Sequence, residues 1–367
     1  MDDERDIREG LERIAGAAAP TGRPPKGFRG RARRRMALTA SVVALTIVAV
    51  VAGGVAGLSA LGRPPVPATG GTSGPTPPPW DPNALHIAFQ SNRTGDWDVW
   101  AMETDGSNLV DLTRDPSADE EPTWSPDGRR IAFASDRSGD WDIWVMDADG
   151  SNPVDITNTP DVSERSPAWS PTGESIAYLR AETKIEGISQ TQIWLMRPDG
   201  SGQRALLLDD AAHGPPSWSP DGSDVVFARV MRTPGTLASS LWIADAGAGK
   251  LSVRRLTDGP DDSDPSWCSD GSPVAFVRSR QADSASSDSI WFVDPGGGSP
   301  TRAPVPGVGS PSDPAWSPDG SELALVSNSR PTPAGDIEIV EPHASASLRL
   351  TSGPADDRAP AWQPRAA

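Results

Sequence analysis

The sequence predicts an all-β fold, a six-bladed β-propeller of four-stranded antiparallel blades, preceded by a single transmembrane helix. The first observation is a tryptophan-centred motif that occurs seven times, at spacings of 44, 45, 49, 49, 49 and 46 residues. The second is the content of glycine and proline, 36 and 39 of 367 residues, which disfavours a helix-rich fold because both residues break helices. The third is one uncharged run of 26 residues at positions 36–61.

The N-terminal segment, residues 1–35, holds ten Lys or Arg and six Asp or Glu, a net charge of +4. Since the whole chain carries −17, residues 36–367 carry −21. So acidic a portion repels phosphate, and we expect no nucleic acid partner. Within the segment, Ile7, Leu11 and Ile14 share one helical face. This face indicates either a short solvated helix or a docking helix for a cytoplasmic partner.

Residues 36–61 are predicted to cross a bilayer, since a helix of this length spans about 39 Å. Basic residues come just before the run: Lys26, Arg29, Arg31, Arg33, Arg34 and Arg35. The positive-inside rule then places the N-terminus in the cytoplasm and the larger C-terminal part outside, in a single-pass protein of the cell membrane. The competing interpretation, a cleaved signal peptide, would have a shorter apolar region and a shorter N-terminal region.

Residues 62–79 are rich in Pro, Gly, Thr and Ser, which predicts a semi-extended linker without a core. Residues 80–367 hold the repeat and average 48 residues for each of six units. The motif reads Trp-Ser-Pro-Asp-Gly in its full form. Its copies begin at Trp124, Trp169, Trp218, Trp267 and Trp316, with degenerate copies at Trp80 and Trp362.

One repeat unit reads as four strands. Residues 130–135, which follow Asp127-Gly128, are predicted as the second strand, and residues 142–147 as the third. Asp149-Gly150 makes a hairpin turn into the fourth strand, residues 153–157. Residues 167–169 then begin the following unit. A four-stranded sheet cannot cover its own faces, whereas repetition around an axis does so, which is the propeller solution.

These residues resemble the TolB-type propeller repeat, a relative of the WD-repeat family. The run 122–157 follows its pattern of Pro-x-Trp-Ser-Pro-Asp-Gly, Ile-Ala-Phe-x-Ser-Asp-Arg, Asp-Ile-Trp-x-Met-Asp-x-Asp-Gly and a closing fourth strand. The resemblance covers residues 80–367 and implies a propeller that binds a protein in the bacterial cell envelope. The chain differs from the family in one respect: a predicted anchor and linker precede the propeller, where TolB-type proteins carry an α/β domain.

The last motif copy, Pro360-Ala361-Trp362, is a first strand with no strands after it. Residues 87–89 begin a unit that lacks its first strand. We therefore expect these two ends of the chain to pair and complete one blade, with Trp80 left as a spare copy beside the seam.

The candidate binding face is the side that carries the second-to-third loops and the blade-to-blade loops, because these loops vary between units. Residues just before each inner strand should crowd the mouth of the central channel there. The candidates are Glu120, Glu121, Glu164, Arg165, His213, Asp262, Asp264, Asp313 and Arg358. Two interpretations are open: an acidic funnel for a cation, basic peptide or amine, or a solvated acidic rim with arginine pairs.

Trp97 and Trp141 stand in the sequence Gly-Asp-Trp-Asp, which occurs only in the first two units. They are either exposed aromatic anchors for a partner or caps that pack the hairpin against its neighbour. Arg93, Arg137, Arg180, Arg229, Arg278 and Arg330 recur near the end of the second strand, where we expect ion pairs between blades. A tryptophan recurs at one position of the third strand and is expected to pack between blades: Trp100, Trp144, Trp194, Trp242 and Trp291. Glu338 occupies the equivalent position in the sixth unit.

The sequence predicts no enzyme, no cofactor and no metal site. The nucleophile elbow of propeller-capped hydrolases, Gly-x-Ser-x-Gly, does not occur in the chain. His213 and His343, two of the three histidines, are expected on opposite faces of the propeller and so cannot bind one metal together. Cys268 replaces the serine of a repeated turn and has no base partner that would make it a nucleophile. A ring of carboxylates could bind calcium, yet the compact Asp-rich calcium loop is missing from the sequence.

The function predicted is that of a membrane-anchored extracytoplasmic scaffold that binds a protein, peptide or envelope polymer. The alternative is a transmembrane sensor that relays ligand binding to a cytoplasmic partner through residues 1–35. Small residues at Gly53, Gly54 and Gly57 would allow close helix contact in such a sensor.

Overall fold

The computed structural model describes residues 84–183, 189–206, 212–233, 236–247, 252–259, 261–282, 285–305, 308–328, 334–342 and 347–364. The predicted segments 1–35, 36–61 and 62–79, and with them Trp80 and the sensor alternative, lie outside these residues. Within the described ranges, no helix has the length and apolarity needed to cross a membrane.

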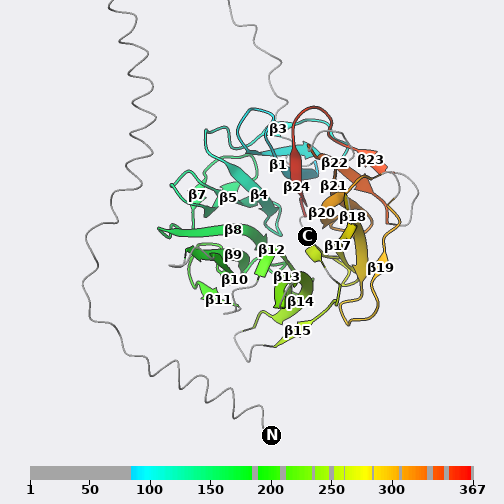
Figure 1. The fold of residues 1–367 in the computed structure, drawn as a ribbon. Coiled ribbons are helices and arrows are strands. Elements are labelled where there is room, and N and C mark those ends of the chain that lie inside the picture. The colour runs from blue at the N-terminus through cyan, green and yellow to red at the C-terminus, as the bar shows by residue number, and fades with distance from the viewer. Residues whose placement is uncertain are drawn as a thin grey trace, which may run out of the picture. The chain divides into compact units, whose positions relative to one another are not determined.

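The described residues form six four-stranded antiparallel sheets, the blades, arranged around a central axis (Figure 1). Blade 1 contains β24 (Asp357–Trp362), β1 (His86–Ser91), β2 (Asp98–Glu103) and β3 (Val110–Asp111). Blade 2 contains β4 (Asp119–Trp124), β5 (Arg130–Ser135), β6 (Asp142–Asp147) and β7 (Val154–Asp155). Blade 3 contains β8 (Val162–Trp169), β9 (Ile176–Thr183), β10 (Ser189–Met196) and β11 (Arg204–Ala205).

The remaining blades follow the same order. Blade 4 contains β12 (Ala212–Trp218), β13 (Asp224–Thr233), β14 (Thr236–Asp245) and β15 (Val253–Arg255). Blade 5 contains β16 (Asp262–Trp267), β17 (Val274–Ala282), β18 (Ala285–Val293) and β19 (Thr301–Arg302). Blade 6 contains β20 (Pro311–Trp316), β21 (Leu323–Ser327), β22 (Asp336–Val340) and β23 (Ser347–Arg349). The predicted six-bladed propeller is confirmed.

The predicted closure of the ring is also confirmed, because β24 supplies the inner strand of blade 1. Ile87 pairs with Trp362 and Gln90 pairs with Arg358 across β1 and β24. Beyond β24, the Gln363 backbone N–H donates to the His86 carbonyl at 2.9 Å, and its side-chain amide donates to the Gly128 carbonyl of blade 2 at 2.9 Å. The C-terminal strand therefore joins blades 1 and 2.

Six core clusters fill the spaces between neighbouring blades. The same position of each second strand contributes one fully buried side chain to these clusters: Phe89, Phe133, Tyr178, Phe227, Phe276 and Leu325. Each packs against the preceding blade, as Phe133 of blade 2 does against Ala88 and Val99 of blade 1. Among the residues that the structure describes, each cluster joins two neighbouring blades, so each blade depends on its neighbours for burial of its apolar faces.

Deletion of residues 358–367 should abolish the cooperative thermal unfolding of the propeller. The deletion removes the partner of β1 and uncovers the cluster that Trp362 shares with Ile87 and Phe89. The measurement is a circular dichroism melt of the full chain and the truncated chain. Removal of residues 365–367 alone, which lie beyond β24, is the control and should leave the transition unchanged. A sharp, unshifted melt of the longer truncation would contradict the closure.

Candidate functional site: the mouth of the central channel

Each inner strand carries a bulge where its pairing with the second strand shifts register. One residue at each bulge adopts a left-handed backbone with φ between 47° and 69°: Glu121, Ser166, Gly214, Asp264, Asp313 and Ala359. A proline follows each of them and has no N–H to donate to the ladder. The bulge thus interrupts pairing six times at the same level around the axis.

The bulge residues connect neighbouring blades by hydrogen bonds to their backbone N–H groups. The Ser166 N–H of blade 3 donates to Glu121 Oε2 of blade 2 at 2.7 Å. The Ala359 N–H of blade 1 donates to Asp313 Oδ2 of blade 6 at 3.5 Å. The Glu121 N–H donates in turn to Gln90 Oε1 of blade 1 at 2.8 Å. Glu121 and Asp313 therefore hold the ring together as well as giving the mouth its charge.

The central channel contains a cavity of about 650 Å³, and five of the six bulge residues, all except Gly214, are part of its lining. Its wall is made of the motif tryptophans and the prolines beside them: Trp124, Trp169, Trp218, Trp267, Trp316 and Trp362, with Pro122, Pro167, Pro216, Pro265, Pro314 and Pro360. The indole N–H groups of Trp124, Trp218 and Trp362 each donate to a backbone carbonyl of the preceding blade in the ring, for example that of Trp218 to the Ala168 carbonyl at 2.9 Å. The wall is therefore largely apolar, and hydrogen bonds hold several of its indole rings in place.

The lining role of the motif tryptophans is the feature that the sequence reasoning missed. It treated them as markers of the repeat. The available signal was their position in the first strand, because the first strand of a propeller blade is the one nearest the axis.

Asp264 and Asp313 occupy equivalent bulges of adjacent blades 5 and 6 and line the cavity. Removal from bulk solvent, together with the nearby Asp313 carboxylate, raises the pKa of Asp264 to about 7. The same removal raises the pKa of Asp313, although the Ala359 N–H and the Arg358 guanidinium favour its charged form. Near neutral pH Asp264 is therefore partly protonated, whereas an ordinary aspartate is fully charged.

The structure brings Glu121, Asp264, Asp313 and Arg358 to the cavity lining. It places Glu120 and Arg165 beside them in an ion pair on the rim. Arg358 also pairs with Asp356 at 2.9 Å. The side chain of His213 lies outside the described residues, although its backbone is part of β12.

Two of the predicted site residues, Glu164 and Asp262, do not reach the cavity. Both are 0% exposed and pair with arginines of their own blades, Glu164 with Arg180 at 3.7 Å and Asp262 with Arg278 at 2.6 Å. Burial raises the pKa of Glu164 to about 7 in spite of its arginine. These two residues therefore support the rim and do not line the channel.

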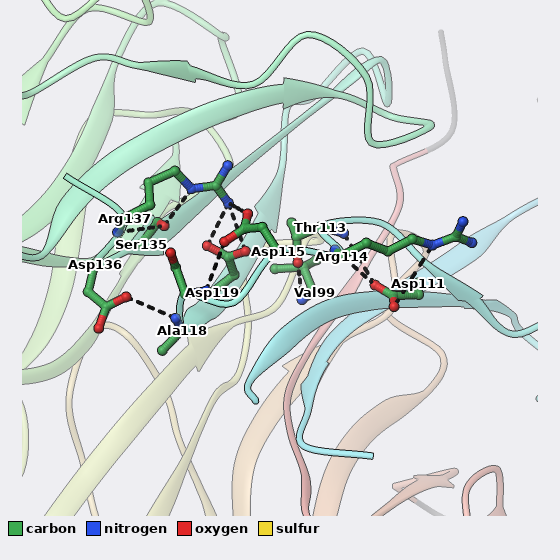
Figure 2. Close-up of polar contacts among 11 residues, drawn as sticks. Val99, Asp111, Thr113, Arg114, Asp115, Ala118, Asp119, Ser135, Asp136 and Arg137 are labelled. Carbon is green, nitrogen blue, oxygen red and sulfur yellow. Dashed lines mark hydrogen bonds and ion pairs between the residues drawn. The ribbon is translucent and has the colours of Figure 1, made fainter. Parts of the chain in front are cut away.

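The recurring arginines form carboxylate pairs mainly within a blade, which corrects the expectation of pairs between blades. The inner and second strands are antiparallel, so the start of one faces the end of the other. Arg93 accordingly pairs with Asp357, and Arg137 pairs with Asp119, each at 2.7 Å. Arg137 also pairs at 2.7 Å with Asp115, which lies in the connection from blade 1 to blade 2 (Figure 2). One ion pair of Arg137 therefore does link two blades.

Each of these guanidinium groups also lies over the recurring tryptophan of the third strand. The distances to the ring centroids are 4.8 Å for Arg93 on Trp100 and 4.7 Å for Arg137 on Trp144. Arg180, Arg229 and Arg278 lie in the same way on Trp194, Trp242 and Trp291. Blade 6 differs, because the buried Glu338 at the tryptophan position pairs with Arg349 at 2.7 Å.

A family model described as the TolB beta propeller domain matches residues 66–239 and 140–365. The chain belongs to the TolB β-propeller family. No curated protein sequence matches the chain.

Solved structures show the same fold at low sequence identity. TolB from Acinetobacter baumannii is 22% identical, with a TM-score of 0.63 over 77% of this chain and 67% of that one. A putative TolB from Agrobacterium tumefaciens is 19% identical, with a TM-score of 0.53 over 73% of this chain and 89% of that one. A puromycin hydrolase S511A mutant complexed with PGG is 16% identical, with a TM-score of 0.50 over 73% of this chain and 51% of that one. These likenesses concern the fold alone.

Replacement of Arg137 by Ala should cost about 3 kcal/mol in free energy of unfolding, because it leaves the fully buried Asp119 carboxylate without its cation. Arg114→Ala is the matched control. Arg114 is 61% exposed and reaches Asp111 only at 3.9 Å, so its loss should cost less than about 0.5 kcal/mol (Figure 2). Urea unfolding of both variants tests the comparison, and equal losses would contradict the assigned role of Arg137.

The propeller should be more stable near pH 5 than near pH 8. The folded chain keeps the Asp264 proton up to about pH 7, whereas the unfolded chain loses it near the ordinary value of 3.8, so stability present at low pH is lost as pH rises through about 7. The double variant Asp264→Asn with Asp313→Asn should reduce this loss by about 1–2 kcal/mol. Thermal unfolding midpoints of the wild type and the double variant at several pH values measure this loss of stability. Asp119, whose pKa is raised to about 6, and Glu164 keep part of the dependence in the variant. Identical pH profiles of the two proteins would refute the assignment.

Proposed function

We propose that this chain is a membrane-anchored, extracytoplasmic binding protein of the cell envelope, without catalytic activity, which binds a protein or peptide at the channel mouth. The observation that carries the proposal is the joint placement of Glu121, Asp264 and Asp313 at the mouth of a cavity walled by tryptophan and proline. Membership of the TolB β-propeller family and the likeness to TolB structures support a protein partner in the envelope.

The chemistry of the mouth favours a basic group on the partner. Three acidic side chains, Glu121, Asp264 and Asp313, stand there against one guanidinium, that of Arg358, which already pairs with Asp356. A Lys or Arg side chain entering the mouth would offset the repulsion between Asp264 and Asp313, and its apolar stem would contact the tryptophan wall. An extended peptide or a loop of the partner can insert such a side chain into the mouth while the rest of the partner stays outside the cavity.

The properties of Cys268 support a role without covalent catalysis. The thiol is buried, and burial raises its pKa to about 11, so the nucleophilic thiolate is strongly disfavoured. It stands in a turn at the end of β16, where blades 2, 3, 4 and 6 have serine. Cys268 therefore takes the place of a turn residue.

The anchor part of the proposal rests on the apolar run 36–61 and the basic residues before it. The same orientation places the acidic propeller outside the cell membrane, where envelope proteins are available as partners.

The test is capture of envelope proteins from a solubilised extract by the full chain. The variant Asp264→Asn with Asp313→Asn replaces both carboxyl groups by neutral amides and keeps the shape of both side chains. The expected result is a partner that is retained by the wild type and reduced at least tenfold with this variant.

The control variant is Asp105→Asn with Asp199→Asn. These residues lie in third-to-fourth strand turns on the opposite face, and asparagine can keep the turn bonds that both aspartates accept. Equal capture by all three proteins would place the binding site away from the mouth, and no specific capture by the wild type would contradict the proposal.

A further inference from the structure

Blades 1 and 2 present the same backbone geometry around the two Gly-Asp-Trp-Asp segments. The Asp119 N–H donates to the Trp97 carbonyl at 2.7 Å, and the Glu164 N–H donates to the Trp141 carbonyl at 2.7 Å. The residues after these two donors, Glu120 and Arg165, are therefore in equivalent positions. Each lies in the inner strand of the blade that follows its tryptophan, Glu120 in β4 and Arg165 in β8.

In the second of these sites the protein supplies its own cation. The Arg165 guanidinium lies over the Trp141 ring, 3.9 Å from the centroid. Its Nη2 pairs with Glu120, and its Nε lies 3.6 Å from Glu121 Oε2. An aromatic face and a carboxylate from the preceding blade thus enclose one guanidinium.

In the first site the equivalent position holds Glu120 in place of an arginine. Trp97 is half-buried, and in the part of the chain that the structure describes no guanidinium lies over its ring. Trp97 also differs from Trp141 in packing, since Trp141 packs against the core between blades 2 and 3, whereas Trp97 is in none of the six clusters. Its ring is therefore not needed to fill the core.

Acidic side chains lie near Trp97, and the Arg137 guanidinium pairs with two of them, Asp115 and Asp119. Asp98 follows Trp97, and the pKa of Asp98 is raised first by burial and then by the nearby carboxylates of Asp111, Asp115 and Asp96. Glu120 accepts only from Arg165 among the described residues, and a carboxylate can accept from two cations. An aromatic face beside carboxylates suits a delocalised cation better than a neutral or anionic group.

We propose that Trp97 and Glu120 form a subsite for an arginine side chain of the partner, in the place that Arg165 fills on Trp141. This inference rests on the proposed function and deepens it, because it names a residue type that the partner must present on the rim between blades 1 and 2. The guanidinium stacks on the Trp97 ring and donates to the Glu120 carboxylate, and the rest of the partner lies toward the channel mouth.

The test uses the full chain in detergent, labelled with fluorotryptophan, and N-acetyl-arginine amide as the probe. Fluorine NMR follows the Trp97 signal, which is assigned by its loss in Trp97→Leu. The expected result is a saturable shift of that signal with the arginine probe. N-acetyl-citrulline amide, which has nearly the same shape and no charge, should bind at least about tenfold more weakly.

Two variants use the internal repeat as a control. Glu120→Arg places a guanidinium where Trp97 lacks one and should abolish the shift. Arg165→Ala uncovers Trp141 and should make the Trp141 signal respond to the probe as a second site. Thermal melts check that each variant is folded, and if Glu120→Arg fails to fold, Trp97→Leu takes its place, with loss of probe binding by equilibrium dialysis as the readout.

The proposal is overturned if the Trp97 signal does not respond to the arginine probe, or if citrulline amide binds equally well. It is also overturned if folded Glu120→Arg protein still shows the shift, or if uncovering Trp141 creates no second site. The experiments distinguish a failure of the subsite from a failure of the proposed function. If Glu120→Arg does not affect capture of a partner, the subsite is rejected and partner binding at the channel mouth is retained. If the probe binds but no partner is captured, the subsite is retained and the proposed function is rejected.

Discussion

The whole structure depends on the burial of sheet faces between blades. A four-stranded sheet has two apolar faces and cannot cover either by itself, so every blade relies on two neighbours. The buried aromatic side chains at one position of the second strands, such as Phe133 and Phe227, each fill a gap toward the preceding blade. This requirement makes the ring closed and leaves the axis as the one region without a packed sheet face. The cavity lies there, surrounded by the inner strands.

The chemistry of the mouth follows from the bulges of the inner strands. A left-handed backbone followed by proline stops the ladder and frees one N–H per blade, which a neighbouring side chain can then accept. Glycine would adopt this conformation with least strain, yet only blade 4 uses it, at Gly214. Acidic residues occupy three of the other five bulges, and two of them, Glu121 and Asp313, accept a backbone N–H of the next blade as well as supplying an acidic group.

The repeat made much of the fold predictable from the sequence. Asp-Gly turns and the Trp-Ser-Pro motif gave the blade number, and the unpaired Pro360-Ala361-Trp362 indicated the closing strand. Periodicity showed that Arg137 and Arg180 are equivalent, but it could not show which carboxylate each one faces, because that depends on strand register. The left-handed bulges and the burial of Glu164 and Asp262 also depend on register, so the candidate site was predicted only in part.

The closure of blade 1 by both ends of the chain has a consequence for biosynthesis. About 270 residues separate β1 from β24, so β1 is made long before its partner exists. At roughly 5–20 residues per second, this interval lasts on the order of tens of seconds. During that time Ile87 and Phe89 lack their neighbours from blade 6, and the open edge of β1 can pair with other chains. A nascent chain of this kind therefore needs either rapid completion or protection of its first strand until the last one arrives.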